Sequence, residues 1–123
     1  MKDIDRNLML VALCWLLVGT VFGLWMGATN SLGYVTIHVA MLLPGFVTLA
    51  VYSIIYRLWP ELKSARLANV QFWVAVIGQL FAVIGTWHNL ATGGIFIVAP
   101  ASTAVIVAAL LMTWQFWNSA KRA

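Results

Sequence analysis

Two histidines are the residues of this chain most able to do chemistry, and both lie inside long apolar runs. His38 lies near the start of TIHVAMLLPGFVTLAVYSIIYRLWP, residues 36–60, and His88 lies in TWHNL near the end of another run. An ionisable side chain within a membrane span marks a functional site by default. The alternative for each histidine is a neutral imidazole that hydrogen-bonds a neighbouring helix or reaches the membrane interface.

The surroundings of the histidines restrict the metal that they could bind. Copper prefers thiolate, thioether or several imidazole ligands, and zinc takes four ligands. Haem iron needs only one or two protein ligands, because the porphyrin supplies four. His38 and His88 are therefore candidate axial ligands, and Met41 and Gly45, which follow His38 at helical spacing, are candidate contacts of the macrocycle. Pro44 should kink this helix about one turn below His38, although a kink and a glycine also suit ordinary packing.

The composition identifies the kind of element that must position these side chains. Hydrophobic residues make up 63% and charged residues 8% of the 123 residues, whereas soluble domains have roughly 45–50% apolar and about 25% charged residues. The composition therefore predicts an integral membrane protein with one domain, residues 1–123, in contact with the lipid bilayer. The basic residues form no stripe of the kind that nucleic acid requires, so we expect no nucleic-acid partner.

Four apolar segments are long enough to cross a membrane, at about residues 8–27, 34–59, 69–90 and 95–117. Turn-forming residues separate them, so we expect an all-α membrane protein with an up-down-up-down helix order. All seven basic residues lie before the first segment, around the second connection or after the fourth segment. The positive-inside rule then places both termini in the cytoplasm of a multi-pass protein of the bacterial inner membrane. Both histidines should lie near the outer face, roughly 3–6 Å inside their span ends.

Small residues at helical spacing predict two faces for close helix packing. The first span carries Gly19, Gly23 and Gly27, and the third carries Ala75, Gly78, Ala82, Gly85 and Asn89. The alternative is that these faces leave room for a flat cofactor.

The second and third spans resemble a known family. His38, the GFV stretch that begins at Gly45, and the ending with Tyr56 and Pro60 resemble the second transmembrane helix of the haem-copper oxidase large subunit. The similarity is to the branch that includes nitric oxide reductases and small stand-alone relatives. The run NVQFWVAVIGQLFAVIG, residues 69–85, is similar to the third helix of that family, so the resemblance covers about residues 34–86.

The resemblance implies that His38 is an axial ligand of a low-spin b-type haem and that four spans form one arc of the family fold. Small relatives often read His-x-His at this point, where this chain has Ala40. The other haem and copper ligands of the family lie on later helices, and His88 has no counterpart among them. We therefore expect no complete oxidase or reductase in this chain by itself.

Two classes of function follow from these observations. The first is a haem b-binding, cytochrome-like membrane protein that transfers electrons or supports a respiratory complex. The alternative is a non-haem structural or accessory subunit that packs in a larger complex. Neighbouring helices lie 8–10 Å apart, which is too close for two imidazoles to sandwich a porphyrin, so haem binding predicts a homo-oligomer (dimer or trimer) or a respiratory-complex partner.

The expected outer rim carries three residues that suit a second kind of ligand. Tyr34, Trp87 and Asn89 lie close to the outer ends of their spans. They are either anchors at the membrane interface or contacts for a quinone headgroup.

Overall fold

The computed structural model describes the backbone of residues 3–122 and the side chains of residues 3–119, and the ordered elements in that range are all helical. The elements are α1 (Ile4–Thr29), η1 (Leu32–Tyr34), α2 (Val35–Ala40), η2 (Met41–Val47), α3 (Thr48–Leu58), η3 (Pro60–Ser64), α4 (Arg66–Thr92) and α5 (Val98–Arg122). The segment from η1 through α3 forms one long helical rod, Leu32–Leu58.

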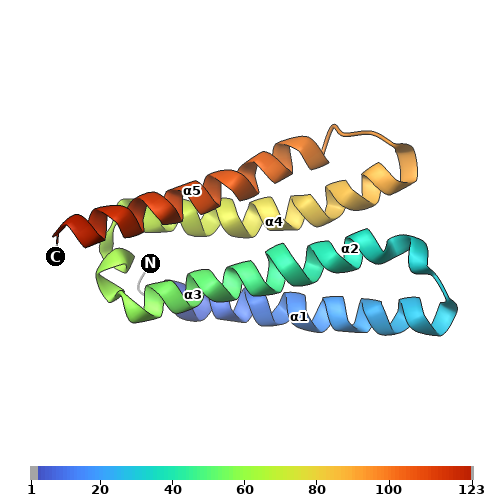
Figure 1. Ribbon diagram of the computed structural model, residues 1–123, viewed down its shortest axis with the longest axis horizontal. Coiled ribbons are helices and arrows are strands. Elements are labelled where there is room, and N and C mark those ends of the chain that lie inside the picture. Colours follow the sequence, from blue (N-terminus) through green and yellow to red (C-terminus); the bar gives the residue numbers. More distant parts are fainter. Residues whose placement is uncertain (1–2, 123) are drawn as a thin grey trace.

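The helices form two antiparallel hairpins that lie side by side (Figure 1). One hairpin pairs α1 with the rod of α2, η2 and α3, and the other pairs α4 with α5. We call the end where α1 begins, η3 turns and α5 finishes the terminal end. The opposite end, which holds the α1–α2 and α4–α5 connections, is the loop end. Consecutive long helices therefore run in opposite directions in this arrangement.

Four helices are long and apolar enough to cross a membrane: Ile4–Thr29, Leu32–Leu58, Arg66–Thr92 and Val98–Ser119. Large apolar side chains also point away from the bundle, among them Leu17, Leu24 and Leu110, which are 68%, 75% and 62% exposed. Such continuous apolar exposure is unfavourable in water and is satisfied by lipid. These features indicate a multi-pass membrane protein.

Two residues with left-handed backbone end the helices at the loop end. Asn30 follows α1 with φ 56°, and its N–H bonds Met26 O; Gly93 follows α4 with φ 75°, and its N–H bonds Asn89 O. Glycine and asparagine adopt this conformation most readily. The fourth helix begins at Val98 rather than at residue 95 as expected. A start at Val98 places Pro100 in the first turn, where its missing N–H breaks no helical hydrogen bond.

The expected kink at Pro44 takes the form of a widened π-helical turn, η2. Proline lacks an N–H and its ring collides with the carbonyl four residues earlier, here that of Ala40. A wider turn relieves this collision without ending the helix. The side chain of Gln79 on α4 donates from Nε2 to Ala40 O at 2.8 Å, so a second helix supplies a donor to this carbonyl.

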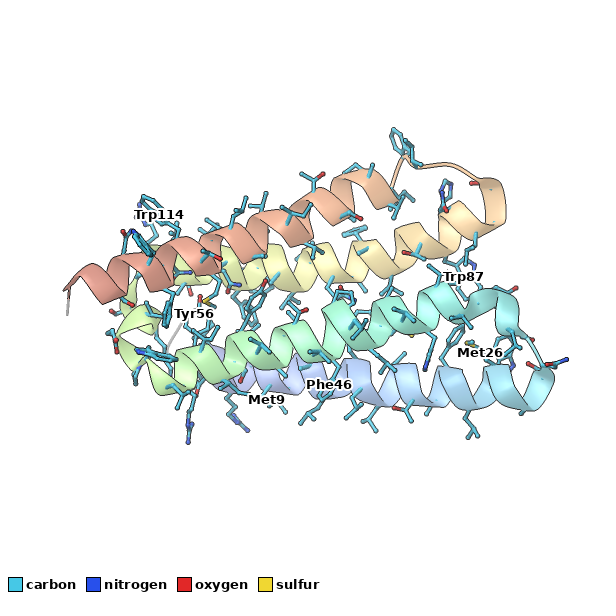
Figure 2. The ribbon with its side chains drawn as sticks, in the orientation of Figure 1. Met9, Met26, Phe46, Tyr56, Trp87 and Trp114 are labelled. Atoms are coloured by element: carbon cyan, nitrogen blue, oxygen red, sulfur yellow. The ribbon has the colours of Figure 1, made fainter. Side chains whose placement is uncertain are left out.

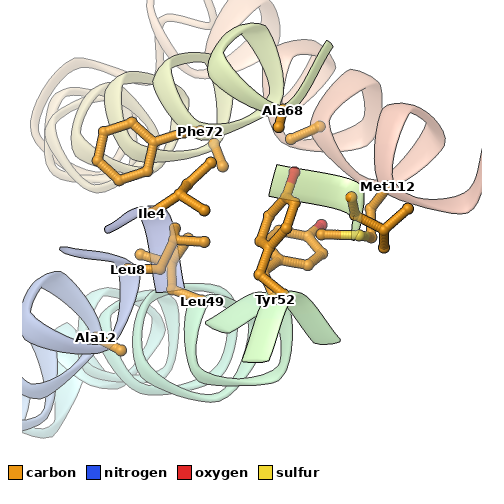
Figure 3. Packing of buried hydrophobic residues seen from close by; sticks show 12 residues of the cluster. Ile4, Leu8, Ala12, Leu49, Tyr52, Ala68, Phe72 and Met112 are labelled. Atoms are coloured by element: carbon orange, nitrogen blue, oxygen red, sulfur yellow. The ribbon is translucent and has the colours of Figure 1, made fainter. Parts of the chain in front are cut away.

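The main core lies towards the terminal end, where all four long helices contribute side chains (Figure 3). Its buried members are Ile4, Leu8, Ala12, Leu49, Tyr52, Tyr56, Leu62, Ala68, Phe72, Ala75, Ala108 and Met112. A smaller cluster of Ile37, Met41 and Val83 lies beside α2. The larger core fixes the two hairpins against each other and leaves the loop end with less buried apolar surface.

The two small-residue faces mainly serve helix packing within the chain. A Cβ added at Gly19 would lie 2.7 Å from Leu42 Cδ2, and one at Gly78 would lie 3.0 Å from Ala104 Cβ. Ala75, Gly78, Ala82 and Gly85 are all buried, which confirms the predicted face of the third span. Gly27 differs, because an added Cβ there would meet nothing within 4 Å.

Candidate functional site

The imidazole of His38 lies against the glycine face of α1. Its Nδ1 is 2.9 Å from the carbonyl oxygen of Gly19. A Cβ added at Gly23 would be 2.6 Å from His38 Cε1, so only glycine leaves space for the ring at this position. The glycines that predicted close helix packing in the first span thus also form the surface against which His38 packs.

This hydrogen bond determines which nitrogen of His38 can bind a metal. A carbonyl oxygen only accepts hydrogen bonds, so Nδ1 must carry the proton and donate to Gly19. In the neutral ring Nε2 then holds the free lone pair, and Nε2 has no hydrogen-bond partner among the described residues. Metal-binding histidines commonly donate their other N–H to a carbonyl in the same way. The half-buried His38 is therefore in the tautomer that a ligand requires.

Met41 and Gly45, the other candidate cofactor contacts, are both buried inside the single chain. Met41 packs in the cluster beside α2. A Cβ added at Gly45 would lie 3.0 Å from both Trp15 Cγ and Gln79 Nε2. The space that glycine leaves at position 45 is thus filled by Trp15 and Gln79.

His88 lies under the connection between α4 and α5. Its Nε2 is 3.5 Å from Thr92 Oγ1, at the limit of a hydrogen bond, and its Nδ1 is buried with no hydrogen-bond partner among the described residues. A Cβ added at Gly94 would lie 3.0 Å from His88 Cε1, so the loop backbone covers the ring. His38 faces α1 and His88 faces the α4–α5 loop, so the chain does not bring the two imidazoles together. The described residues hold no group of three or more His, Cys, Asp or Glu that could bind a metal ion.

The loop end carries a cluster of four aromatic side chains, Phe22, Trp25, Tyr34 and Trp87. The rings of Tyr34 and Trp87 stack with centroids 5.4 Å apart and an interplanar angle of 18°. Figure 2 shows Trp87 at this end of the bundle. Asn89 donates from Nδ2 to Gly94 O at 3.1 Å and so holds the α4–α5 loop. Tyr34 and Trp87 therefore pair with each other, and Asn89 bonds the loop backbone.

The interior also contains a hydrogen-bonded polar group that sequence analysis missed. Tyr56 donates to Gln71 Oε1 at 3.1 Å and accepts from Gln115 Nε2 at 3.2 Å, which links α3, α4 and α5. Tyr56 lies between the hairpins in Figure 2. Gln71 Nε2 also donates to Ala108 O at 3.4 Å. Glutamines within apolar runs were the available signal, because polar side chains in membrane helices usually face other helices.

We expect Tyr56→Phe to destabilise the bundle by about 1 kcal/mol, because it removes two interhelical hydrogen bonds that each average about 0.6 kcal/mol in a membrane. The measurement is the unfolding midpoint in detergent. Tyr52→Phe is the matched control, since Tyr52 is a buried tyrosine on the same helix whose hydroxyl makes no hydrogen bond with the described residues. Equal loss of stability in the two variants would contradict a special role for the Tyr56 hydroxyl.

At the terminal end, a buried carboxylate joins three elements. Asp5 Oδ1 is 2.9 Å from Lys63 Nζ, and Asp5 Oδ2 is 3.2 Å from Arg57 Nη1. Ser53 donates from Oγ to the backbone oxygen of Asp5 at 2.6 Å. The charged side chains of Asp5, Arg57 and Lys63 thus join α1, α3 and η3.

Comparisons with models of known protein families, with curated proteins and with solved structures found no match to this chain.

Proposed function

We propose that this chain is a haem b-binding, cytochrome-like membrane protein in which His38 is an axial ligand through Nε2. The observation that carries this proposal is the Nδ1–H···O hydrogen bond from His38 to Gly19, which leaves the lone pair on Nε2. Bound haem would supply one-electron redox chemistry. The role would be electron transfer, or support of a respiratory complex, as the resemblance to one arc of haem-copper oxidases implies.

His38 suits the role of an iron ligand, but the residues around it do not form an enclosed haem pocket within one chain. Gly23 is covered by the imidazole, and the space at Gly45 is filled. The two histidines of one chain face different elements. We therefore propose that the second ligand is His38 or His88 of a second copy, in a dimer or trimer, or a residue of a respiratory-complex partner. In each copy the Gly19 carbonyl would then orient His38, which is the iron ligand.

The visible spectrum of the purified protein tests this proposal. Protein extracted from its own membrane in mild detergent should show a sharp α-band after reduction, as low-spin haem with two axial ligands does. A folded but colourless preparation, obtained from cells supplied with haem precursor, would contradict the proposal.

A second candidate is a non-haem structural or accessory subunit. The observation in its favour is again at His38, since the bond to Gly19 and the packing against Gly23 give this polar side chain a role without any metal. Under this proposal the exposed apolar side chains of the bundle contact a larger membrane complex as well as lipid. A colourless protein that copurifies in a defined complex would support this candidate.

We also propose an orientation in the bacterial inner membrane with the terminal end in the cytoplasm. Arg57 lies in the last turn of α3, Lys63 lies in η3 and Arg66 begins α4, so all three lie at that end. Basic residues concentrate on the cytoplasmic side of membrane proteins. In a Cys14→Ser background, Phe96→Cys should react with a membrane-impermeant thiol reagent added outside spheroplasts, because residue 96 lies at the loop end and is 86% exposed. Labelling only after lysis would show that the loop end lies in the cytoplasm, which contradicts the proposed orientation.

A further inference from the structure

A cavity of about 350 Å³ opens between α1 and α3 at the terminal end, apart from the histidines. Arg6 and Arg57 line it together with Met9, Leu10, Ser53 and Ile54, and Asp5 forms part of its wall. The cavity thus combines cationic side chains with apolar side chains, and it lies on the outside of the first hairpin.

The two helices present the same arrangement of side chains to this cavity. On α1, Arg6 is followed one turn deeper into the bundle by Met9 and Leu10. On α3, which runs in the opposite direction, Ile54 lies one turn deeper than Arg57. Both helices therefore place a guanidinium at the end of the span and an apolar side chain one turn deeper within it. Leu10 and Ile54 are each 49% exposed, so the apolar part is open to lipid.

The charges around this cavity favour an anion. Lys63 and Arg57 both contact the Asp5 carboxylate, which itself is 6% exposed. The Arg57 side chain is 79% exposed, so Asp5 holds one of its nitrogens while the guanidinium still faces outward. Arg6 is exposed and forms no ion pair with the described residues. Two cations, Arg6 and Arg57, line the cavity, and Asp5, the one acidic residue of the lining, is also paired with Lys63 from outside it. The opening of the cavity is therefore positively charged.

We propose that this cavity binds an anionic phospholipid, with the phosphate between Arg6 and Arg57 and one acyl chain along Met9, Leu10 and Ile54. Guanidinium groups bind phosphate oxygens through paired hydrogen bonds. Basic clefts between membrane helices on the cytoplasmic side bind anionic headgroups in this manner. The proposal rests on membrane insertion and on the proposed orientation, and it is independent of haem.

The test compares two lipids on delipidated full-length protein in neutral detergent. Phosphatidylglycerol should raise the unfolding temperature more than phosphatidylcholine of the same chain length. Arg6→Gln should weaken the apparent affinity for phosphatidylglycerol about five-fold, because one interfacial cation contributes about 1 kcal/mol and 1.4 kcal/mol corresponds to tenfold. Arg6 is the preferred site for the variant because it does not hold Asp5, so the fold should be unchanged. Arg66→Gln, which removes an exposed charge at the same end outside the cavity, should leave the affinity unchanged.

Four outcomes would overturn the proposal. Equal stabilisation by the two lipids would remove the preference for an anion, and equal weakening by Arg66→Gln would show attraction by the whole basic end. Protection by inorganic phosphate equal to that by phosphatidylglycerol would show that the acyl chain is not bound. A cavity covered by a second copy of the chain would appear as no response to either lipid, which also contradicts the proposal.

Discussion

Gly85→Ala should destabilise the α4–α5 hairpin by about 1–3 kcal/mol, the usual range for inserting a group into a well-packed site. A Cβ at Gly85 would lie 2.6 Å from both N and Cα of Val98 and 3.0 Å from the carbonyl carbon of Ile97. All three contacts are to backbone atoms, which cannot move aside as the end of a flexible side chain can. The start of α5 would have to move away from α4. Thermal unfolding in detergent measures the loss.

The matched control for this prediction is Gly27→Ala. An added Cβ at Gly27 meets nothing within 4 Å, and alanine is more favourable than glycine inside a helix by up to about 1 kcal/mol. Gly27→Ala should therefore leave stability unchanged or raise it, whereas Gly85→Ala should lower it. A rise in stability in both variants would show that helix propensity, rather than the approach of α5 to α4, determines the result at Gly85.

His38→Asn should remove haem from the protein without unfolding it. The asparagine amide can donate to Gly19 O in place of His38 Nδ1, but it offers no lone pair in place of Nε2. The variant separates the structural role of His38 from its role as a ligand. We expect the sharp α-band to disappear while the circular dichroism of the helices is unchanged. A low-spin spectrum identical to that of wild type would refute His38 as the ligand.

The two roles of His38 also predict different losses of stability when the residue is replaced. A ligand that binds only the folded state at a hundredfold excess over Kd stabilises it by about 2.7 kcal/mol. An interhelical hydrogen bond in a membrane averages about 0.6 kcal/mol. If His38 is a ligand, His38→Asn and His38→Ala should both lose the larger amount. If it is only a hydrogen-bond donor, His38→Asn should be close to wild type. His88→Ala should have the smaller effect on the spectrum, because only its depth in the membrane supports it as a ligand.

The sequence by itself predicted four helices long and apolar enough to cross a membrane, and the structure has four such helices among its described residues. Hydropathy and length are local properties, and Asn30 and Gly93 end helices because few other residues adopt a left-handed backbone. The small-residue faces were predicted from helical spacing and are confirmed at Gly19, Gly78 and Gly85. The widened turn around Pro44 also follows from a local cause, the missing N–H of proline.

Only the tertiary structure decided what each polar side chain contacts. His38 and Gly19 are 19 positions apart, and Gln79 bonds a carbonyl 39 positions away at Ala40. Spacing within one helix defines a face but does not say which other helix covers it. In a membrane the apolar pattern is also a weak guide, because lipid and protein interior are similarly apolar and helix pairing depends on shape and hydrogen bonds. The tautomer of His38 and the burial of Gly45 therefore follow from how α1, α2 and α4 fit together.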